Sequence, residues 1–264
     1  MPMAGLGQRF VEDGYHTPKP LIEVKGKPMF MAVLDDLPKA DIYVFVLRKN
    51  MKNLDNILKI IKKNYPKSVI KILDKESNGQ ATTCLEGLNS LSKKYPKFKG
   101  SITFASCDTG FIYEEKKFFN LLRSGKSDVL VWSSNNHTTA TRFPNLFGWI
   151  NKDKNRIKSV SVKKALKNPS KDSLITGTFT YRNIDIFKNS IDSLIKRNEL
   201  VNGELYLDSS INDSIKIGYN CEIFEVENMI SWGTPNDLQT FTYWESCFKK
   251  LKHHKFNGFN KNKS

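Results

Sequence analysis

Two glycines and two cations near the start of the chain form a candidate anion-binding site. In the segment G-L-G-Q-R-F (residues 5–10), Gly5 and Gly7 allow a tight turn whose successive amides can face an anion without an intervening Cβ. Arg9 adds a guanidinium to this turn, and Lys19 adds an ammonium ten residues later. Amides, a guanidinium and an ammonium together suit the charge of a nucleoside triphosphate. The pattern therefore predicts a triphosphate-binding loop.

The loop differs from the two common glycine-rich phosphate motifs. A dinucleotide-binding fingerprint needs a third glycine, and a P-loop needs Gly-Lys followed by Ser or Thr, and the loop contains neither. The sequence therefore predicts a third solution to phosphate binding.

A carboxylate follows another predicted strand. The apolar run 102–105 predicts a strand, and Asp108 comes just after it. Because the carboxyl ends of strands in open α/β sheets face the ligand crevice, Asp108 is well placed to hold a Mg²⁺ ion that bridges phosphate oxygens. A plain strand-end or helix-capping role for Asp108 is the alternative.

A glycine turn separates the predicted strand 69–73 from an apolar stripe of helical spacing at 81–91. Gly79 permits the turn, and Gln80 offers both a hydrogen-bond donor and an acceptor, which suits the edge of a nucleotide base. An ordinary helix start is the alternative.

The elements that must position these residues alternate between strands and helices. Strands are predicted at 42–47, 69–73, 102–105, 129–132, 147–150, 157–162, 174–181 and 222–226. Helices are predicted near 54–61, 81–91, 184–195 and 204–215, and from Thr234 as N-cap with Pro235 at the first helical position. The alternation predicts an α/β fold with a mostly parallel, twisted sheet flanked by helices.

The first strand of this sheet is short in the sequence. A phosphate loop of this kind should follow a strand of about 5–6 residues, yet only four residues precede Gly5. We expect either a stunted strand or a start upstream of Met1, and favour the second because an absent central strand would cost stability.

The net charge of +15 raises the question of nucleic-acid binding. The lysines are spread along the whole chain, however, and aromatic residues do not interleave with them as a stacking platform requires. We expect no nucleic-acid partner, and a positive field that helps to collect a nucleotide.

Cysteine usage and hydropathy point to the cytoplasm. The four cysteines lie far apart, which disfavours a zinc site or a disulfide framework. No apolar run approaches 18 residues, and no signal peptide is visible, so we expect no membrane association.

Three pieces of the sequence carry a family resemblance. G-x-G-x-R-F, P-K-P-L and G-K-P-M, in this order and spacing near the start of the chain, resemble the nucleotidyltransferases that make sugar nucleotides, the nucleoside-diphosphate-sugar pyrophosphorylases. The resemblance implies a Rossmann-like nucleotidyltransferase domain over 1–250, with a nucleotide half at about 1–134 and an acceptor half, with a smaller β region, at about 135–250. Residues 251–264 would be a basic, flexible tail.

The resemblance also implies roles for single residues. Arg9 would bind the triphosphate and the leaving pyrophosphate, Lys19 would bridge the α-phosphate and the acceptor phosphate, and Asp108 would hold Mg²⁺. The nucleotide-binding residues would be Ala4, Gly5, Leu6, Gly7, Gly79 and Gln80.

On the acceptor side, three residues are similar to positions that the family uses. Lys163 resembles the lysine that binds the acceptor phosphate, although the assignment could shift to Lys164. Gly177 resembles a glycine that lies against the substrate, and Glu204 a glutamate near the acceptor.

The sequence departs from the family pattern at the second metal ligand. Many members carry an Asp two residues before the glycine at position 233, and this chain has Ser231. The ion would then be held by Asp108 with phosphates and water, or Glu227 would substitute. The sequence of the segment around Ser231 resembles that of a capsule- and lipopolysaccharide-associated, cytidylyltransferase-like branch of the family.

The expected function is a Mg²⁺-dependent nucleotidyl transfer. A nucleoside monophosphate would pass from an NTP (CTP before UTP or dTTP) to a phosphorylated sugar or other small phosphomonoester, with release of pyrophosphate, for capsule or surface polysaccharide synthesis. The alternatives are a glycosyltransferase that uses a nucleotide sugar and a non-catalytic nucleotide-binding paralogue. The sequence leaves open the acceptor and whether the chain forms a homo-oligomer.

Overall fold

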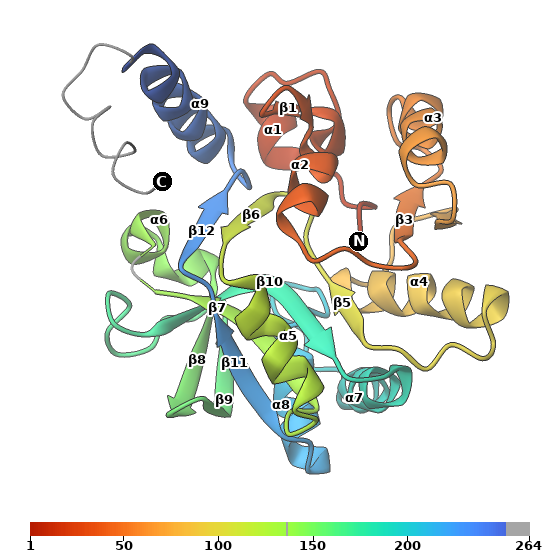
Figure 1. The fold of residues 1–264 in the computed structure, drawn as a ribbon, viewed down its shortest axis with the longest axis vertical. Helices are drawn as coiled ribbons and strands as arrows, with labels where there is room; N and C mark the ends of the chain where they lie inside the picture. The colour runs from red at the N-terminus through yellow and green to blue at the C-terminus, as the bar shows by residue number, and fades with distance from the viewer. Residues whose placement is uncertain (136, 252–264) are drawn as a thin grey trace.

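Strands and helices alternate through residues 1–135 and 137–251, the part of the chain described by the computed structural model (Figure 1). The strands are β1 (Glu23–Val24), β2 (Lys27–Pro28), β3 (Val44–Arg48), β4 (Val69–Leu73), β5 (Ile102–Phe104), β6 (Thr109–Ile112), β7 (Val129–Ser134), β8 (Gly148–Asp153), β9 (Arg156–Val162), β10 (Ser173–Tyr181), β11 (Cys221–Glu225) and β12 (Asn228–Ser231). The α-helices are α1 (Gln8–Glu12), α2 (Met29–Asp36), α3 (Leu54–Asn64), α4 (Gln80–Lys94), α5 (Glu115–Arg123), α6 (Thr138–Arg142), α7 (Ile184–Arg197), α8 (Ser209–Ile217) and α9 (Pro235–Lys250), and the short 3₁₀ helices are η1 (Lys19–Leu21) and η2 (Pro144–Leu146).

The largest sheet has the strand order β5-β10-β7-β11-β9-β8, and β8 also pairs with β10. Strand β11 runs parallel to β7, and β10 runs antiparallel between β5 and β7, so that β5, β7 and β11 share one direction. Strands β3 and β4 form a separate parallel pair. The predicted α/β fold is confirmed.

Parallel pairing is confined to the β3–β4 and β7–β11 pairs among the described strands. Strands β8 and β9 pair antiparallel because a short turn joins them, whereas a parallel pair such as β3–β4 needs a crossover helix, here α3. The smaller β region expected in the second half of the chain corresponds to β8 and β9.

The central strand β7 is buried on both faces and organises the core. Val129 and Val131 pack with apolar residues of α4, α7 and α8, whereas Leu130 and Trp132 pack on the opposite face with Phe118 of α5. The period of two along the strand sends alternate side chains to opposite faces, so helices cover both sides.

One predicted helix begins later than expected. The sequence predicts helix from position 204, but α8 begins at Ser209. Val201 and Glu204 form an antiparallel bridge, and the backbone of Leu205 bonds to the chain before α4, so these residues are held in an extended path. The helix start at Thr234 and Pro235 is confirmed, because the Thr234 side chain accepts the N–H of Asp237.

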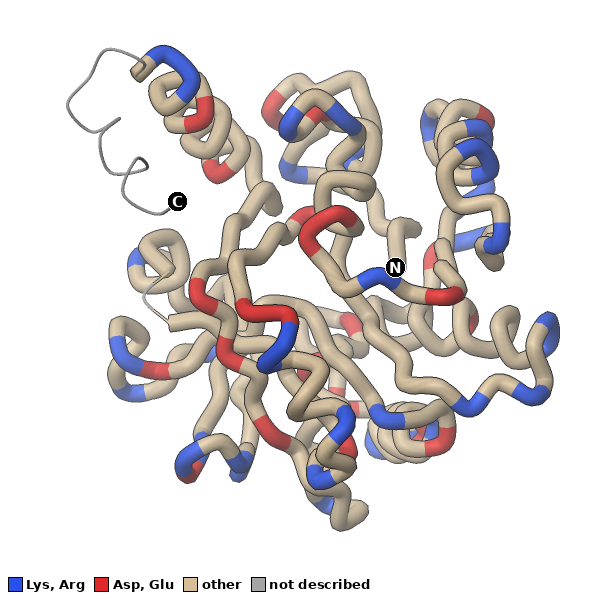
Figure 2. Tube along the Cα trace, in the orientation of Figure 1, with Lys and Arg blue, Asp and Glu red and all other residues tan. Residues whose placement is uncertain are grey.

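The residues before Gly5 form a single bridge rather than a strand. Pro2 pairs in parallel with Val46 of β3, and this is an isolated β-bridge. The predicted tail at 251–264 lies outside the described residues except for Leu251. Figure 2 shows Lys and Arg on helices and turns across the molecule rather than along one stripe of the chain. None of the helices in the described part is both long and apolar enough to cross a membrane.

Candidate functional site

Lys19 and Asp108 meet in the structure although 89 positions separate them in the sequence. The Lys19 Nζ lies 2.5 Å from Oδ2 of Asp108 and 3.3 Å from the carbonyl oxygen of Gly233. Both side chains are about one-fifth exposed (19% and 20%), so a ligand can reach them. Three distant segments therefore converge on one ion pair at the end of β5.

The glycine loop lies directly against this ion pair. Gly7 has a φ of 65° and precedes α1, and a Cβ at this position would lie 3.3 Å from the Cβ of Lys19. The ring of Phe10, in α1, is buried and its centroid is 5.5 Å from the Lys19 Nζ. Gly5 and Leu6 are exposed, which leaves the predicted phosphate loop open to solvent.

The glycine loop packs against the segment that joins β12 to α9 and against the first turns of α9. Phe10 belongs to a buried cluster with residues of α2 and with Trp232 and Leu238. The N–H of Trp232 donates to the carbonyl oxygen of Asp108 at 2.8 Å. Figure 1 accordingly shows α1 and α2 between β12 and α9 on one side and α3 on the other.

The electrostatic environment keeps Lys19 and Asp108 charged. Burial favours the neutral form of each side chain, but their mutual attraction and hydrogen bond outweigh burial. The pKa of Lys19 is therefore raised and that of Asp108, which also accepts bonds from Ser106 and Thr109, is lowered. We conclude that the pair supplies fixed charges rather than a proton at neutral pH.

Two other cations, Arg9 and Lys163, lie within electrostatic range of the Lys19–Asp108 pair. The exposed Arg9 lies close enough for its charge to disfavour protonation of Lys19 and Lys163, although the pKa of Lys19 is still raised overall. Lys163 in turn feels the charge of Asp108. The structure thus places Arg9 and Lys163 within electrostatic range of the ion pair that Lys19 forms with Asp108, an arrangement suited to a polyanionic ligand.

The predicted base-reading loop is held by the acceptor half of the chain. Gly79 has a φ of 113°, and a Cβ there would lie 2.7 Å from the backbone N and O of Leu205. The Leu205 N–H donates to Asn78 at 2.9 Å, and its carbonyl accepts from Ala81 at 3.0 Å. Gln80, the first residue of α4, is half-buried beside this junction.

Two of the three predicted acceptor residues, Lys163 and Glu204, lie within electrostatic range of each other, and Gly177 lies beside Ser106. Lys163 follows β9 with a φ of 54°, donates from Nζ to the Leu146 carbonyl, and lies 5.5 Å from the ring centroid of Tyr206. Burial lowers its pKa, and Glu204 is close enough to oppose this effect. Gly177 sits in the irregular part of β10, where a Cβ would lie 3.8 Å from Oγ of Ser106.

The structure favours Lys163 over Lys164 for the acceptor role. Lys163 is half-buried and its ammonium makes a cation–π contact with the ring of Tyr206, whereas Lys164 is exposed. The roles themselves stay predictions.

Sequence reasoning missed Asp208 as a member of this site. Its carboxylate lies against Gly148, where an added Cβ would clash with Oδ2, and it attracts Lys163. Burial raises the pKa of Asp208 to about 6, despite the opposing charge of Lys163. Only the approach of β8 to the start of α8 creates this environment, so no local sequence signal marks it.

Replacing Asp208 by Asn should stabilise the protein above pH 6. The pKa is about 6 in the folded state and 3.8 in the unfolded state, so ionising Asp208 costs about 2–3 kcal/mol at pH 7.5 and less than about 1 kcal/mol at pH 4. Asp208→Asn removes this cost, and we expect its melting temperature to exceed that of the unmodified chain by about 4–10 °C at pH 7.5. The difference should shrink to about 1–2 °C at pH 4. Asp192→Asn, at an exposed position of α7, should leave the melting temperature nearly unchanged at pH 7.5.

Ser231, at the position of the expected second carboxylate, belongs to a separate hydrogen-bond network. Its hydroxyl donates to Oδ2 of Asp237 at 3.1 Å and accepts from the N–H of Gly233 at 3.3 Å. The hydroxyl of Thr139 donates to the other oxygen of Asp237 at 2.9 Å. Asp237 is buried and engaged in these bonds.

The register of β12 disfavours the alternative that Glu227 replaces the missing carboxylate. Strand β12 pairs with β6 so that Ser231 lies opposite Thr109 and Asn228 lies opposite Ile112. Glu227 is therefore at the far end of β12, about 13 Å along the strand from Ser231. Glu227 is exposed there, remote from Asp108.

The donor set at Asp108 fits a Mg²⁺ ion that shares its ligands with a substrate. A Cβ on Gly233 would lie 3.1 Å from Oδ2 of Asp108 and 3.5 Å from Oγ of Ser231, so both oxygens border the same space. Among the described residues, no group of three or more His, Cys, Asp or Glu side chains could hold a metal ion. Mg²⁺ is commonly bound by one or two carboxylates together with substrate phosphates and water, so one carboxylate is sufficient.

Comparison with known proteins supports the fold rather than a sequence relationship. No protein-family model matches the chain, and no curated protein matches it. A nucleoside-diphosphate-sugar pyrophosphorylase from Vibrio cholerae superposes with a TM-score of 0.74 at 21% identity, covering 92% of this chain and all of the other. The inositol-1-phosphate CTP transferase from T. maritima superposes with a TM-score of 0.69 at 14% identity (96% and 95% covered), and a UDP-glucose pyrophosphorylase with 0.70 at 14% identity (94% and 97%).

Proposed function

We propose that this chain, which has the nucleotidyltransferase fold, transfers a nucleoside monophosphate from an NTP to a phosphorylated small molecule and releases pyrophosphate. The observation that carries the proposal is the contact of Lys19 with Asp108 beside the glycine loop, with Arg9 and Lys163 close by. Fixed cations around one carboxylate suit a reaction in which phosphates must be aligned and their charge neutralised.

In this proposal the residues act mainly by position and charge. Arg9 binds the β- and γ-phosphates and stabilises the leaving pyrophosphate. Lys19, whose raised pKa keeps it protonated, contacts the α-phosphate while an oxygen of the acceptor phosphate attacks the phosphorus in line. Lys163 orients the acceptor phosphate, and Gly79 and Gln80 receive the base.

Asp108, with Ser231 beside it, would hold the Mg²⁺ ion. The ion supplies charge neutralisation for the phosphate oxygens when it is bound. Because the charge and hydrogen bond of Lys19 outweigh burial and leave Asp108 ionised, its carboxylate is ready to bind a cation without losing a proton. Lys19 must then share or yield its contact with Oδ2, which would bring its ammonium nearer to the substrate.

CTP is the first nucleotide to test. The resemblance of the segment around Ser231 to a cytidylyltransferase-like branch favours CTP, and an inositol-1-phosphate CTP transferase is among the similar structures. A UDP-glucose pyrophosphorylase is similar to a comparable degree, so UTP and dTTP follow. The acceptor would be a sugar phosphate or another small phosphomonoester of capsule or surface polysaccharide synthesis, made in the cytoplasm.

The test is thermal unfolding with CTP, UTP, dTTP, ATP and GTP, each with Mg²⁺ and with EDTA. A ligand at 100 times its dissociation constant stabilises a protein by about 2.7 kcal/mol, which corresponds to roughly 5–10 °C for a chain of this size. We expect such a shift with a pyrimidine triphosphate and Mg²⁺, and a smaller one with EDTA. Pyrophosphate release with a panel of phosphomonoesters then identifies the acceptor.

Matched lysine variants separate specific binding from general charge. Lys19→Ala should abolish the shift, whereas Lys27→Ala, which removes an exposed lysine paired with Asp35, should preserve it. If no triphosphate shifts the melting temperature of the folded chain, the proposal fails. A shift with nucleotide sugars alone would instead indicate a glycosyltransferase, and triphosphate binding without turnover a non-catalytic paralogue.

A further inference from the structure

A buried carboxylate, that of Asp237, lies one hydrogen bond away from the space beside Asp108. Asp237 is in the first turn of α9 and is only 9% exposed. The hydroxyl of Ser231, which borders that space, donates to its Oδ2 at 3.1 Å. The hydroxyl of Thr139, in α6, donates to its Oδ1 at 2.9 Å. Strand β12 and helix α6 therefore hold this carboxylate from two sides.

The capping of α9 does not account for the carboxylate of Asp237. The cap uses the backbone N–H of this residue, which donates to Oγ1 of Thr234 at 3.1 Å. In a capping box the acidic side chain would reach back to the backbone N–H of the N-cap residue. Both carboxylate oxygens of Asp237 instead accept from hydroxyls of other elements. Two neutral hydroxyls leave the charge of a buried carboxylate in place, and a nearby cation would stabilise it further.

The bond to Asp237 fixes the direction of the Ser231 hydroxyl. A hydroxyl has one proton to donate and two lone pairs that accept. The proton of Ser231 points to Asp237, and one lone pair accepts from the N–H of Gly233 at 3.3 Å. The second lone pair is left for a ligand in the space that Ser231 shares with Asp108. Ser231 therefore presents an acceptor, rather than a proton, to that space.

Three oxygen atoms around this space are acceptors. A Cβ on Gly233 would lie close to both Oδ2 of Asp108 and Oγ of Ser231, and the carbonyl oxygen of Gly233 contacts the ammonium of Lys19. Oxygen acceptors suit a cation, and oxygen is the ligand that Mg²⁺ prefers. The bond to Asp237 makes the Ser231 oxygen a stronger ligand, because it draws the hydroxyl proton away from the space.

We infer that Asp237 acts through Ser231 as a positioning residue for the metal ion, in place of a carboxylate at position 231. The negative charge then lies one hydrogen bond behind the ligand oxygen instead of on it. This inference rests on the proposed function, because it concerns the ion that accompanies the NTP. It adds a role for a residue that itself contacts neither the ion nor the substrate.

Binding of Mn²⁺ tests the inference, since oxygen sites that suit Mg²⁺ also suit Mn²⁺. The chain is mixed with CTP, UTP or dTTP in turn, and the relaxation of water protons reports Mn²⁺ held by protein and nucleotide together. We expect Asp237→Asn to weaken this binding by about 10- to 100-fold. An amide can donate its own N–H to Ser231, which would turn the hydroxyl proton toward the metal ion.

Two further variants distinguish this role from a contribution to folding alone. Ser231→Ala should weaken Mn²⁺ binding to a similar extent, and adding Asp237→Asn to it should cause no further loss, since Asp237 acts through Ser231. Ser231→Asp combined with Asp237→Asn moves the carboxylate to position 231 and should restore Mn²⁺ binding. Better packing around α9 could not produce such a rescue.

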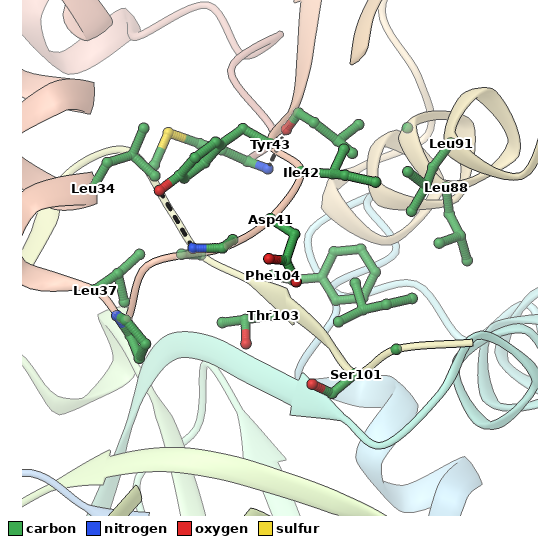
Figure 3. Close-up of a pocket in the computed structure, with 18 of the residues that line it drawn as sticks. Leu34, Leu37, Asp41, Ile42, Tyr43, Leu88, Leu91, Ser101, Thr103 and Phe104 are labelled. Carbon is green, nitrogen blue, oxygen red and sulfur yellow. Dashed lines mark hydrogen bonds between the residues drawn. The ribbon is translucent and has the colours of Figure 1, made fainter. Parts of the chain in front are cut away.

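The control for stability is Leu88→Ala. Leu88, in α4, lines a largely apolar cavity between β3 and β5, where Figure 3 shows its side chain beside that of Leu91. Removing these buried methyl groups should lower the melting temperature by at least about 4 °C. Mn²⁺ binding should stay unchanged, because Leu88 is remote from Ser231 in the fold.

Mn²⁺ binding by Asp237→Asn that matches the unmodified chain would overturn the inference and leave the proposed function standing. Additive losses in the variant that combines Ser231→Ala with Asp237→Asn, or no rescue by Ser231→Asp in a folded chain, would also overturn it. So would an equal loss in Leu88→Ala, because binding would then follow stability. If the unmodified chain holds no Mn²⁺ with any of the three triphosphates, the proposed function fails together with this inference.

Discussion

Replacing Asp108 by Asn is expected to lower Mg²⁺-dependent pyrophosphate release by roughly 100-fold or more. The amide keeps the size of the side chain but removes the charge that holds Lys19 at 2.5 Å and that would bind the metal ion. Turnover with saturating NTP and acceptor measures the loss. The NTP-dependent melting shift, recorded with Mg²⁺ and with EDTA, measures whether the metal contribution is lost with it.

The matched control is Asp128→Asn. Asp128 also forms a partly exposed ion pair, with Arg182, and its side chain is 16% exposed, close to the 20% of Asp108. Asp128 lies just before β7, at the opposite end of this strand from the site. The Asp128→Asn protein should therefore lose stability without a comparable loss of turnover. Near-normal turnover of Asp108→Asn, or an equal loss in both variants, would remove Asp108 from the mechanism.

Replacing Gly79 by Ala is expected to be the most destabilising single substitution in the site. At a φ of 113° and a ψ of −177°, non-glycine residues are strained by about 1–3 kcal/mol. The added Cβ would also lie 2.7 Å from two backbone atoms of Leu205, which cannot rotate away. We expect a loss of about 3 kcal/mol or more, seen as a fall in melting temperature of at least 6 °C.

Gly203→Ala is the control for a positive φ without the contact. Gly203 also has a positive φ, 80°, but nothing lies within 4 Å of a Cβ built there. The difference between the two variants therefore reports the close approach of the Gly79 loop to Leu205 together with the greater backbone strain at Gly79. Gly79→Ala should also weaken NTP binding, because moving this loop displaces Gln80. Equal effects of the two substitutions would show that the contact with Leu205 contributes little.

The junction between Gly79 and Leu205 connects the loop predicted to bind the base with the residues predicted to bind the acceptor. The loop predicted to bind the base shares two backbone hydrogen bonds with Leu205, which precedes Tyr206 and Asp208. Tyr206 and Asp208 in turn contact or attract Lys163, the predicted acceptor ligand. A displacement at one half would therefore be transmitted to the other through a few residues.

The sequence by itself determined the class of fold and the local properties of the glycine loop that is predicted to bind phosphate. Gly5, Gly7 and Arg9 lie within five positions, so their backbone freedom and charge are local properties. The alternation of apolar runs and helical stripes is equally local, and it predicted β3, β4, β5 and β7 to β11 in their observed places. The strand directions around β10 and the late start of α8 escaped prediction, because distant pairing partners decide them.

Only the tertiary structure decided which of these residues share a site. It brought Lys19 to Asp108 and Gly79 to Leu205, and it carried Glu227 to the far end of β12. It also gave Asp208 its raised pKa by packing it against Gly148. Short-range properties such as glycine conformation can be read from neighbours along the chain, whereas ion pairing, burial and pKa depend on groups that only folding brings within a few ångströms.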